Sequence, residues 1–425
     1  NIILDAGITN YNNRNISQHQ HLVSKHFSGI IMLRFLLAGA YVLISLILGM
    51  AIGYSKEDIH LLIILLANQF FISFILYLRS NLSGLHLFKQ DSIVSVTDRF
   101  LMILICGYLI CYNNGTYLNI ENFVHTQSAS YLITAVVAIV FLQGRISFQK
   151  LNWQPAFYIA ILKKSLPFAL LILLMTFYSR IDSIMLERLL PDGAFYAGVY
   201  AQAYRILDAV NMFGFLFASL LLPMFSHMIK KHLDIQPLTN LAFKLLMIPA
   251  LTLAAIGLYF SNDIMNLLYH EHGALSAPVF TMLMFSFVCI STSYIFGTLL
   301  TANGSLQNLN LTALGGMILN ISLNLFLIPQ YKASGAAFAG LITQVIMALA
   351  QIILAVKILN WKPDWKLMGK LLLFFTLIAL IANIAVRYYP DIKTILVIIL
   401  LAPILAFSLG LLRISELKSI MKEQQ

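Results

Sequence analysis

The sequence predicts an all-α membrane protein with many spans, and two observations carry that prediction. The 425 residues are 60% hydrophobic and only 10% charged, whereas an ordinary soluble domain is about 25% charged. The apolar residues also occur in blocks of about 20, which is the length a helix needs to cross about 30 Å of hydrocarbon. Together these observations indicate a polytopic helical membrane protein.

Twelve apolar segments are long enough to be membrane spans. The loops between them are short, so none holds a separate soluble domain. In chain order, the predicted spans are 29–50, 59–78, 95–112, 128–144, 165–187, 198–226, 241–260, 277–300, 309–328, 334–357, 366–388 and 394–412.

The basic residues predict the orientation of these spans, because Lys and Arg are enriched in cytoplasmic loops. When the segment before the first span is placed in the cytoplasm, most of the 27 lysines and arginines fall on that side. The C-terminal tail, with Lys418 and Lys422, is then cytoplasmic as well.

Three parts of the chain are predicted from the placement of its loops. The longest basic connector runs from Arg145 to Lys164, and we expect it to join two lobes. The predicted parts are an incomplete N-terminal lobe over 1–150, a C-terminal lobe over 151–360, and two further membrane helices with a tail over 361–425.

Composition also argues against several other functions. The net charge of +10 is explained by basic cytoplasmic loops and does not indicate nucleic-acid binding. The cysteines lie in or beside apolar segments without metal-ligand spacing, so neither a disulfide framework nor a metal centre is expected.

The chain begins at Asn1, in what looks like the end of an apolar segment. We therefore expect a fragment that lacks its natural N-terminus.

Four arginines lie within apolar spans: Arg34, Arg99, Arg180 and Arg205. A charge in hydrocarbon is costly, so such residues usually face a cavity or a partner. Together they predict a cationic path for a large anionic solute. Arg34 and Arg99 lie near the cytoplasmic ends of their spans, where snorkelling or a local ion pair explains them equally well. Arg180 and Arg205 lie deeper, in the outer half of the membrane.

Two aspartates accompany the deep arginines. Arg205 and Asp208 are three residues apart, on one helix face, and can pair directly. Arg180 and Asp182 point to different faces, so each needs partners on other helices. One interpretation is a salt-bridge network that holds the helices together. The other is a cavity where arginine binds phosphate and a carboxylate replaces it when the site is empty. A protonatable Asp182 or Asp208 would then couple transport to a cation gradient.

Uncharged polar residues also recur within the spans. Tyr196, Tyr200 and Tyr204 form one stripe along the helix that carries Arg205. We predict a weak sugar contact at Tyr200 and Tyr204, with a tyrosine belt at the membrane interface as the alternative. Asn320 and Asn324 would line a hydrated cavity or form hydrogen bonds between helices.

One stretch resembles a known family. Arg180–Asp182, followed by 198–206 (GVYAQAYRI), is similar to the R-x-D … G-x-Y-x-x-A-Y-R/K-I pattern of polysaccharide biosynthesis proteins. These are the Wzx-type O-antigen and capsule flippases, which belong to the MOP exporter superfamily with the MATE drug exporters. Residues 4–11 and 14–16 resemble the cytoplasmic end of that family's second helix and the loop after it.

The resemblance implies a MATE-like bundle of fourteen helices, of which the first two would be missing from this chain. It implies alternating access by two rocking lobes around a cationic cavity. The implied passenger is an undecaprenyl-pyrophosphate-linked oligosaccharide, an O-antigen or capsule repeat unit. It would cross the bacterial inner membrane, on the way to lipopolysaccharide or capsule, in exchange for H⁺ or Na⁺. Polysaccharide polymerase or assembly proteins are the implied partners. Arg180, Asp182 and Arg205 match the motif, whereas Arg34 and Arg99 rest on position alone.

Three other functions are alternatives to this one. A MATE-like multidrug antiporter would share the fold, but buried arginines would repel organic cations. A membrane glycosyltransferase or polymerase would need a sizeable loop or domain outside the hydrocarbon, and no such segment is evident, so we expect no enzyme. A purely structural membrane subunit is the third alternative.

Overall fold

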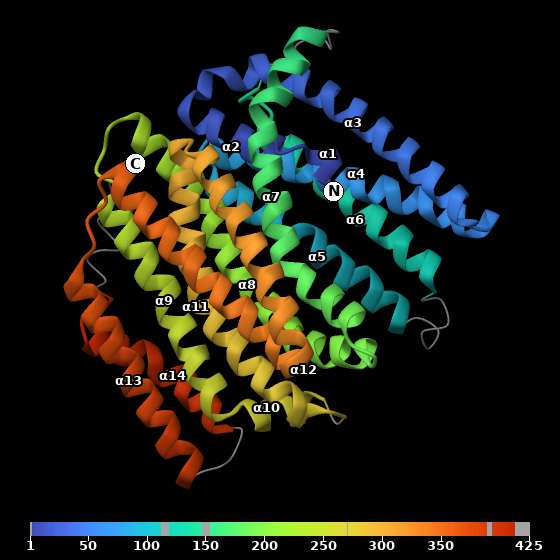
Figure 1. Ribbon diagram of the computed structural model, residues 1–425. Helices are drawn as coiled ribbons and strands as arrows, with labels where there is room; N and C mark the ends of the chain where they lie inside the picture. The colour runs from blue at the N-terminus through green and yellow to red at the C-terminus, as the bar shows by residue number, and fades with distance from the viewer. Residues whose placement is uncertain (1, 112–118, 147–153, 270, 389–392, 413–425) are drawn as a thin grey trace. The chain divides into compact units, whose positions relative to one another are not determined.

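The computed structural model describes residues 2–111, 119–146, 154–269, 271–388 and 393–412. All regular elements within these ranges are helices (Figure 1). Ten of them are long and apolar enough to cross a membrane. The prediction of an all-α, multi-pass membrane protein is confirmed.

The chain forms two compact units. Unit 1 comprises Asn1–Leu173 and Leu222–Lys230, and unit 2 comprises Leu174–Leu221 and Lys231–Gln425. The predicted domain boundaries at 150/151 and 360/361 stay a prediction, because the first falls in 147–153, outside the described residues. The predicted cytoplasmic tail around Lys418 lies outside them too.

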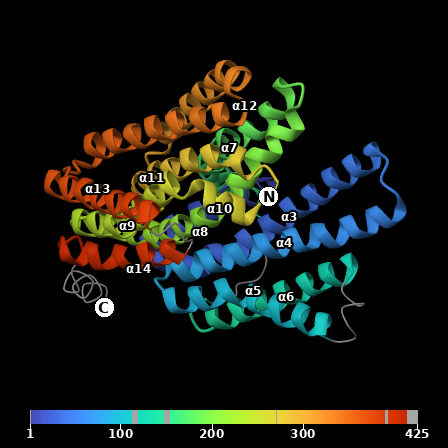
Figure 2. The ribbon, with the colours of Figure 1, turned by 90° about the horizontal axis from the view of Figure 1, so that it is seen from below.

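Unit 1 is built from helices that pack in pairs. Figure 2 shows α3 beside α4 and α5 beside α6, and α4 also packs on α6. Capping fixes two of the helix starts: Ser55 and Asp58 form a capping box at α4, and Asn119 caps α6. The elements are α1 (Ile2–Asp5), α2 (Ile8–Gln18), the 3₁₀ turn η1 (Gln20–Leu22), α3 (Val23–Ile52), α4 (Lys56–Gly84), α5 (Phe88–Cys111), α6 (Ile120–Leu142) and the first part of α7 (Pro155–Leu189).

Unit 2 has an apolar core shared by α7 to α12, which includes Tyr200, Phe280, Phe287 and Ala336. The last two helices, α13 and α14, pack along α9 and on each other (Figure 1). The remaining elements are α8 (Gly193–Lys230), α9 (Gln236–Tyr259), α10 (Ser261–Leu268), α11 (Gly273–Asn303), α12 (Leu306–Leu359), α13 (Trp365–Tyr388) and α14 (Lys393–Ser408).

Each of the twelve predicted spans falls on a helix, but the helix ends differ. The backbone of α12 breaks at Lys332, where φ is 55°, so this helix holds the two predicted spans 309–328 and 334–357. Many helices run past the predicted ends; α7, for example, starts at Pro155 rather than 165. In α7 the charged pair Lys163 and Lys164 separates the apolar first turns, 155–162, from the predicted span, so hydropathy alone did not join them. The total of fourteen helices stays a prediction.

The opening residues differ from the predicted loop. Residues 8–18 form helix α2, with Ile8, Tyr11 and Ile16 buried on one side. Ala6 and Gly7 have positive φ, and they separate this helix from α1. Burial of this apolar face stabilises the helix. The asparagines between the apolar residues lower the hydropathy of the segment, so hydropathy did not predict a helix there.

Gly7 provides a test of this arrangement. Its φ is +75°, and a Cβ atom there would lie 2.4 Å from the Ser165 carbonyl oxygen and 2.5 Å from the Ala169 nitrogen. We expect Gly7→Ala to lower the free energy of unfolding by more than about 1 kcal/mol, because backbone atoms cannot move aside easily. Gly39→Ala is the matched control: it lies within α3 with nothing within 4 Å of the added atom. Thermal unfolding in detergent measures both, and equal melting temperatures would contradict the prediction.

Candidate functional site

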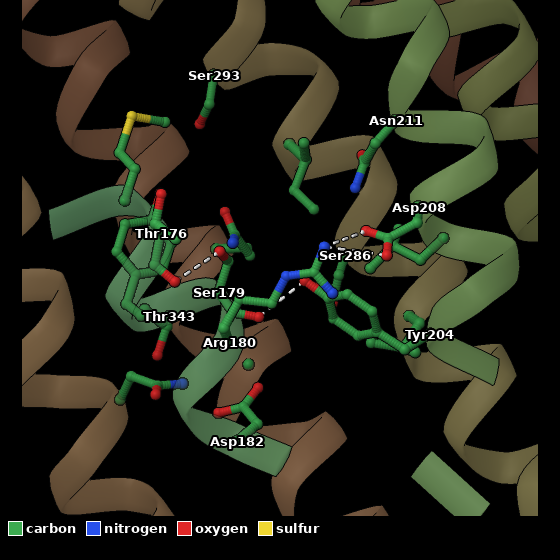
Figure 3. A pocket seen from close by; sticks show the side chains of 18 of the residues that line it. Thr176, Ser179, Arg180, Asp182, Tyr204, Asp208, Asn211, Ser286, Ser293 and Thr343 are labelled. Carbon is green, nitrogen blue, oxygen red and sulfur yellow. Dashed lines mark hydrogen bonds and ion pairs between the residues drawn. The ribbon is translucent and has the colours of Figure 1, made fainter. Parts of the chain in front are cut away.

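Unit 2 contains a cavity of about 300 Å³ lined by α7, α8, α11 and α12 (Figure 3). Its charged lining residues are Arg180, Asp182 and Asp208. The rest of the polar lining is hydroxyl, phenol and amide groups: Thr176, Tyr178, Ser179, Tyr200, Tyr204, Asn211, Ser286, Ser293, Tyr294, Asn320, Thr343 and Gln344. This lining is rich in uncharged hydrogen-bonding groups, with charge confined to α7 and α8.

A tight turn brings α7 and α8 together. The Gly193 nitrogen donates a hydrogen bond to the Leu190 carbonyl oxygen at 3.1 Å, which closes the turn. A Cβ atom on Gly193 would lie 2.1 Å from the Glu187 carbonyl oxygen, so only glycine fits there. The two helices therefore run back along each other, and Arg180 of α7 reaches Asp208 of α8.

Arg180 and Asp208 form the accessible ion pair of the cavity. The Arg180 Nη2 atom lies 3.1 and 3.2 Å from the two Asp208 carboxylate oxygens. The side chains are 58% and 43% exposed. The guanidinium carbon lies 5.0 Å from the centre of the Tyr204 ring, and the Tyr204 hydroxyl donates to the Ser179 carbonyl at 2.8 Å. An exposed pair of this kind contributes at most about 1 kcal/mol, so an anion can displace the carboxylate.

Asp182 lies on another face of α7 and has different partners. Its side chain is buried. The Tyr200 hydroxyl donates to it at 2.9 Å, and the Asn324 amide donates at 2.7 Å. Asn324 also donates to Asn320 at 3.1 Å. As the sequence indicated, Arg180 and Asp182 take their partners from other helices.

The sequence predicted that Asn320 and Asn324 line a cavity or form hydrogen bonds between helices. In the structure Asn320 lines the cavity and Asn324 donates to Asp182 of another helix. Asn320 and Asn324 are fully buried in α12, one helical turn apart. The sequence feature that indicates a shared role is the spacing of these two amides, four residues apart in an apolar span. Their role depends on which helix faces them, which the sequence does not show.

Of the remaining predicted residues, some line this cavity and others do not. Arg205 is exposed, and Asp208, its predicted partner, pairs with Arg180 instead. Of the tyrosine stripe, Tyr200 and Tyr204 line the cavity with stacked rings 5.5 Å apart. The hydroxyl of Tyr196 instead accepts a hydrogen bond from Lys332.

Arg34 and Arg99 belong to unit 1, and each has partners there. Arg34 is only 2% exposed, and its Nη2 atom lies 2.6 Å from the Asp5 carboxylate. Its guanidinium also donates to Ser73 and Thr9 and lies over the Tyr77 ring. Arg99 is exposed and lies 3.5 Å from Asp98. Ion pairing within unit 1 therefore accounts for both arginines.

Comparisons with known proteins agree with this fold. The family described as polysaccharide biosynthesis protein matches residues 1–229, so the chain belongs to that family. The Vibrio cholerae MATE transporter VcmN in the bent form is similar in structure, with a TM-score of 0.66, 15% identity, and 84% of this chain and 85% of that chain covered. A MOP superfamily transporter from Pyrococcus furiosus is similar too, with a TM-score of 0.66, 14% identity, and the same coverage of 84% and 85%. None of the curated proteins matches the chain in sequence.

The chain thus belongs to a polysaccharide biosynthesis family and has the fold of the MATE transporters, that of a multi-pass membrane protein.

The buried Arg34 and the exposed Arg180 should differ in how much they contribute to the free energy of unfolding. Arg34→Met would leave the Asp5 carboxylate without its cation, and we expect a loss of about 3 kcal/mol in the free energy of unfolding. Arg180→Met removes an exposed pair and should change it by no more than about 1 kcal/mol. Thermal unfolding of the purified variants in detergent tests this difference. A larger loss for Arg180→Met would mean that this pair is structural.

Proposed function

We propose that the protein is a flippase for undecaprenyl-pyrophosphate-linked oligosaccharide, an O-antigen or capsule repeat unit. It moves this lipid from the cytoplasmic to the periplasmic face of the bacterial inner membrane by alternating access, in exchange for a cation. The family match supports a polysaccharide precursor as the passenger. The structural observation that carries the proposal is the half-exposed Arg180, held in the cavity by a displaceable carboxylate.

The chemistry of Arg180 suits a pyrophosphate group. A guanidinium stays charged and binds phosphate oxygens through two parallel hydrogen bonds. Tyr204 supports one face of this guanidinium, which keeps it oriented while its partner changes. In the proposed cycle Asp208 forms an ion pair with Arg180 while the cavity holds no substrate. The pyrophosphate replaces the Asp208 carboxylate when the substrate enters.

The uncharged part of the lining suits the sugars. Hydroxyl and amide side chains can both donate to and accept from sugar hydroxyl groups. Tyr204 and Tyr294 add aromatic surface beside them. In the proposed arrangement the lipid tail stays in the bilayer while pyrophosphate and sugars occupy the cavity.

The charge of the cavity supports coupling to a cation. One arginine and two aspartates line it, so the ionised lining has a formal excess of one negative charge. When the passenger has left and Asp208 has returned to Arg180, the carboxylate of Asp182 remains to be neutralised. A cation bound there would accompany the return of the empty carrier.

A MATE-like multidrug cation antiporter is the second candidate, because the same excess of carboxylates would attract an organic cation. The Pyrococcus furiosus relative is described as having a binding pocket of reversed polarity, which suggests a different function. Pocket charge therefore varies within this fold, and we favour the flippase because of the family match.

The proposed orientation places the C-terminus in the cytoplasm, where the basic residues are concentrated in sequence. Polysaccharide polymerase or assembly proteins are the proposed partners.

Surface glycan in cells that depend on this gene tests the proposal. We expect Arg180→Ala to lower the glycan by at least about tenfold, since a hydrogen-bonded charge contributes about 1.5–3 kcal/mol. Arg180→Lys should retain part of the activity, because lysine keeps the charge but not the paired geometry. Arg205→Ala, outside the cavity lining, is the control and should behave like the unaltered protein. If Arg180→Ala leaves the glycan intact and instead changes drug resistance, the antiporter is correct.

A further inference from the structure

The connection between α12 and α13 is fixed to the rest of unit 2. Its Trp361 side chain is 3% exposed and meets the Phe296 ring at a steep angle, with ring centroids 4.8 Å apart. The Gln236 side chain in α9 donates to the Lys362 carbonyl oxygen at 2.6 Å and accepts from the Lys362 nitrogen at 3.3 Å. Asp364 accepts hydrogen bonds from two backbone nitrogens in the first turn of α13. The residues that begin α13 are therefore held in a defined position.

Lysines are concentrated around this connection and form a basic patch. Its members are Lys357, Lys362, Lys366 and Lys370, and Asp364 is the one carboxylate between positions 357 and 370. The first three of these lysines are exposed. No ion pair joins any of the four to a carboxylate of the residues that the structure describes. The basic patch therefore carries positive charge that the described part of the chain does not neutralise.

An apolar face of α13 continues from the basic patch. Trp365, Gly369 and Leu372 have helical spacing and lie on one side of the helix. Trp365 is 79% exposed and Leu372 is 66% exposed. A Cβ atom on Gly369 would meet nothing within 4 Å. The packing of α13 is on α9 and α14 (Figure 1), so this apolar face is left uncovered, and it carries no side chain at Gly369.

These features match the two ends of a phospholipid. Tryptophan is enriched where the hydrocarbon meets the headgroups, and lysine clusters beside a span attract anionic headgroups. In the proposed orientation this end of α13 lies on the cytoplasmic side, whose leaflet carries negative charge. Orienting a span requires only positive charge near its end. Here the charge, an exposed tryptophan and an uncovered apolar face are held together by a fixed backbone, which indicates a specific site.

We propose that Lys362, Lys366 and the α13 face over 365–372 bind an anionic phospholipid. The phosphate lies on the two lysines, whose ammonium groups each have three donors on a flexible stem, and an acyl chain lies along Gly369. None of these residues belongs to the cavity lining. The site therefore does not depend on which molecule the cavity transports.

Binding of phosphatidylglycerol to the purified full chain tests the site. In phosphatidylcholine nanodiscs, addition of phosphatidylglycerol should raise the melting temperature. In detergent, native mass spectrometry measures the affinity for phosphatidylglycerol. Lys362→Gln combined with Lys366→Gln should lower this affinity by at least about tenfold. Lys163→Gln combined with Lys164→Gln is the control, because it removes the same charge from two exposed lysines of α7, and it should bind phosphatidylglycerol normally.

A variant of Gly369 tests the apolar face without changing the charge. Gly369→Leu should melt no lower than the unaltered protein, because leucine favours a helix more than glycine does. It should nevertheless bind phosphatidylglycerol more weakly, because the new side chain occupies the place of the acyl chain. Unchanged binding in Gly369→Leu would contradict the proposal.

Three further results would overturn the site. One is a melting temperature that phosphatidylglycerol raises no more than phosphatidylcholine does. Another is an equal loss of affinity in the Lys163 and Lys164 control, since surface charge alone would then explain the binding. The third is a melting temperature that inorganic phosphate raises through Lys362 and Lys366 while phosphatidylglycerol does not, which would assign a soluble anion in place of a lipid.

Discussion

The constraint on which this structure depends is that charge within a membrane needs a partner. Three of the intramembrane charges meet it in different ways. Arg34 is buried and held by Asp5, Ser73 and Thr9. Arg180 is accessible and shares one carboxylate. Asp182 is buried among neutral donors. The first arrangement stabilises a fold, and the other two leave room for a ligand.

The tight turn between α7 and α8 brings the partners of these charges together in one site. Because Gly193 lets the two helices run back along each other, a short stretch of α7 presents charge on two faces. Arg180 meets α8 at Asp208, and Asp182 meets α8 and α12 at Tyr200 and Asn324. Anion binding and cation binding can thus be carried out by residues two positions apart without direct competition between their side chains. Such proximity suits a carrier in which one ligand leaves before the other enters.

Most of the helices could be predicted from hydropathy, because lipid imposes a length and a composition on every span. The partners of the charged residues could not be predicted in this way. Arg205 and Asp208 have helix spacing that favours pairing, yet Asp208 pairs with Arg180 across the turn, since helix packing rather than spacing decides which faces meet. Asn320 and Asn324 were visible as buried amides, but their contact with Asp182 joins residues far apart in the chain. Helix α2 was missed because its apolar face is interrupted by asparagines.

The central claim is that Asp208 occupies Arg180 in place of a phosphate group. It is tested most directly by the affinity of the purified protein for undecaprenyl pyrophosphate in a double-mutant cycle of the two residues. Asp208→Asn should bind this lipid more tightly than the unaltered protein, because Arg180 is released. Arg180→Ala should bind it weakly, and the double variant should bind it no better than Arg180→Ala. A weaker affinity in Asp208→Asn, or unaltered affinity in Arg180→Ala, would contradict the claim.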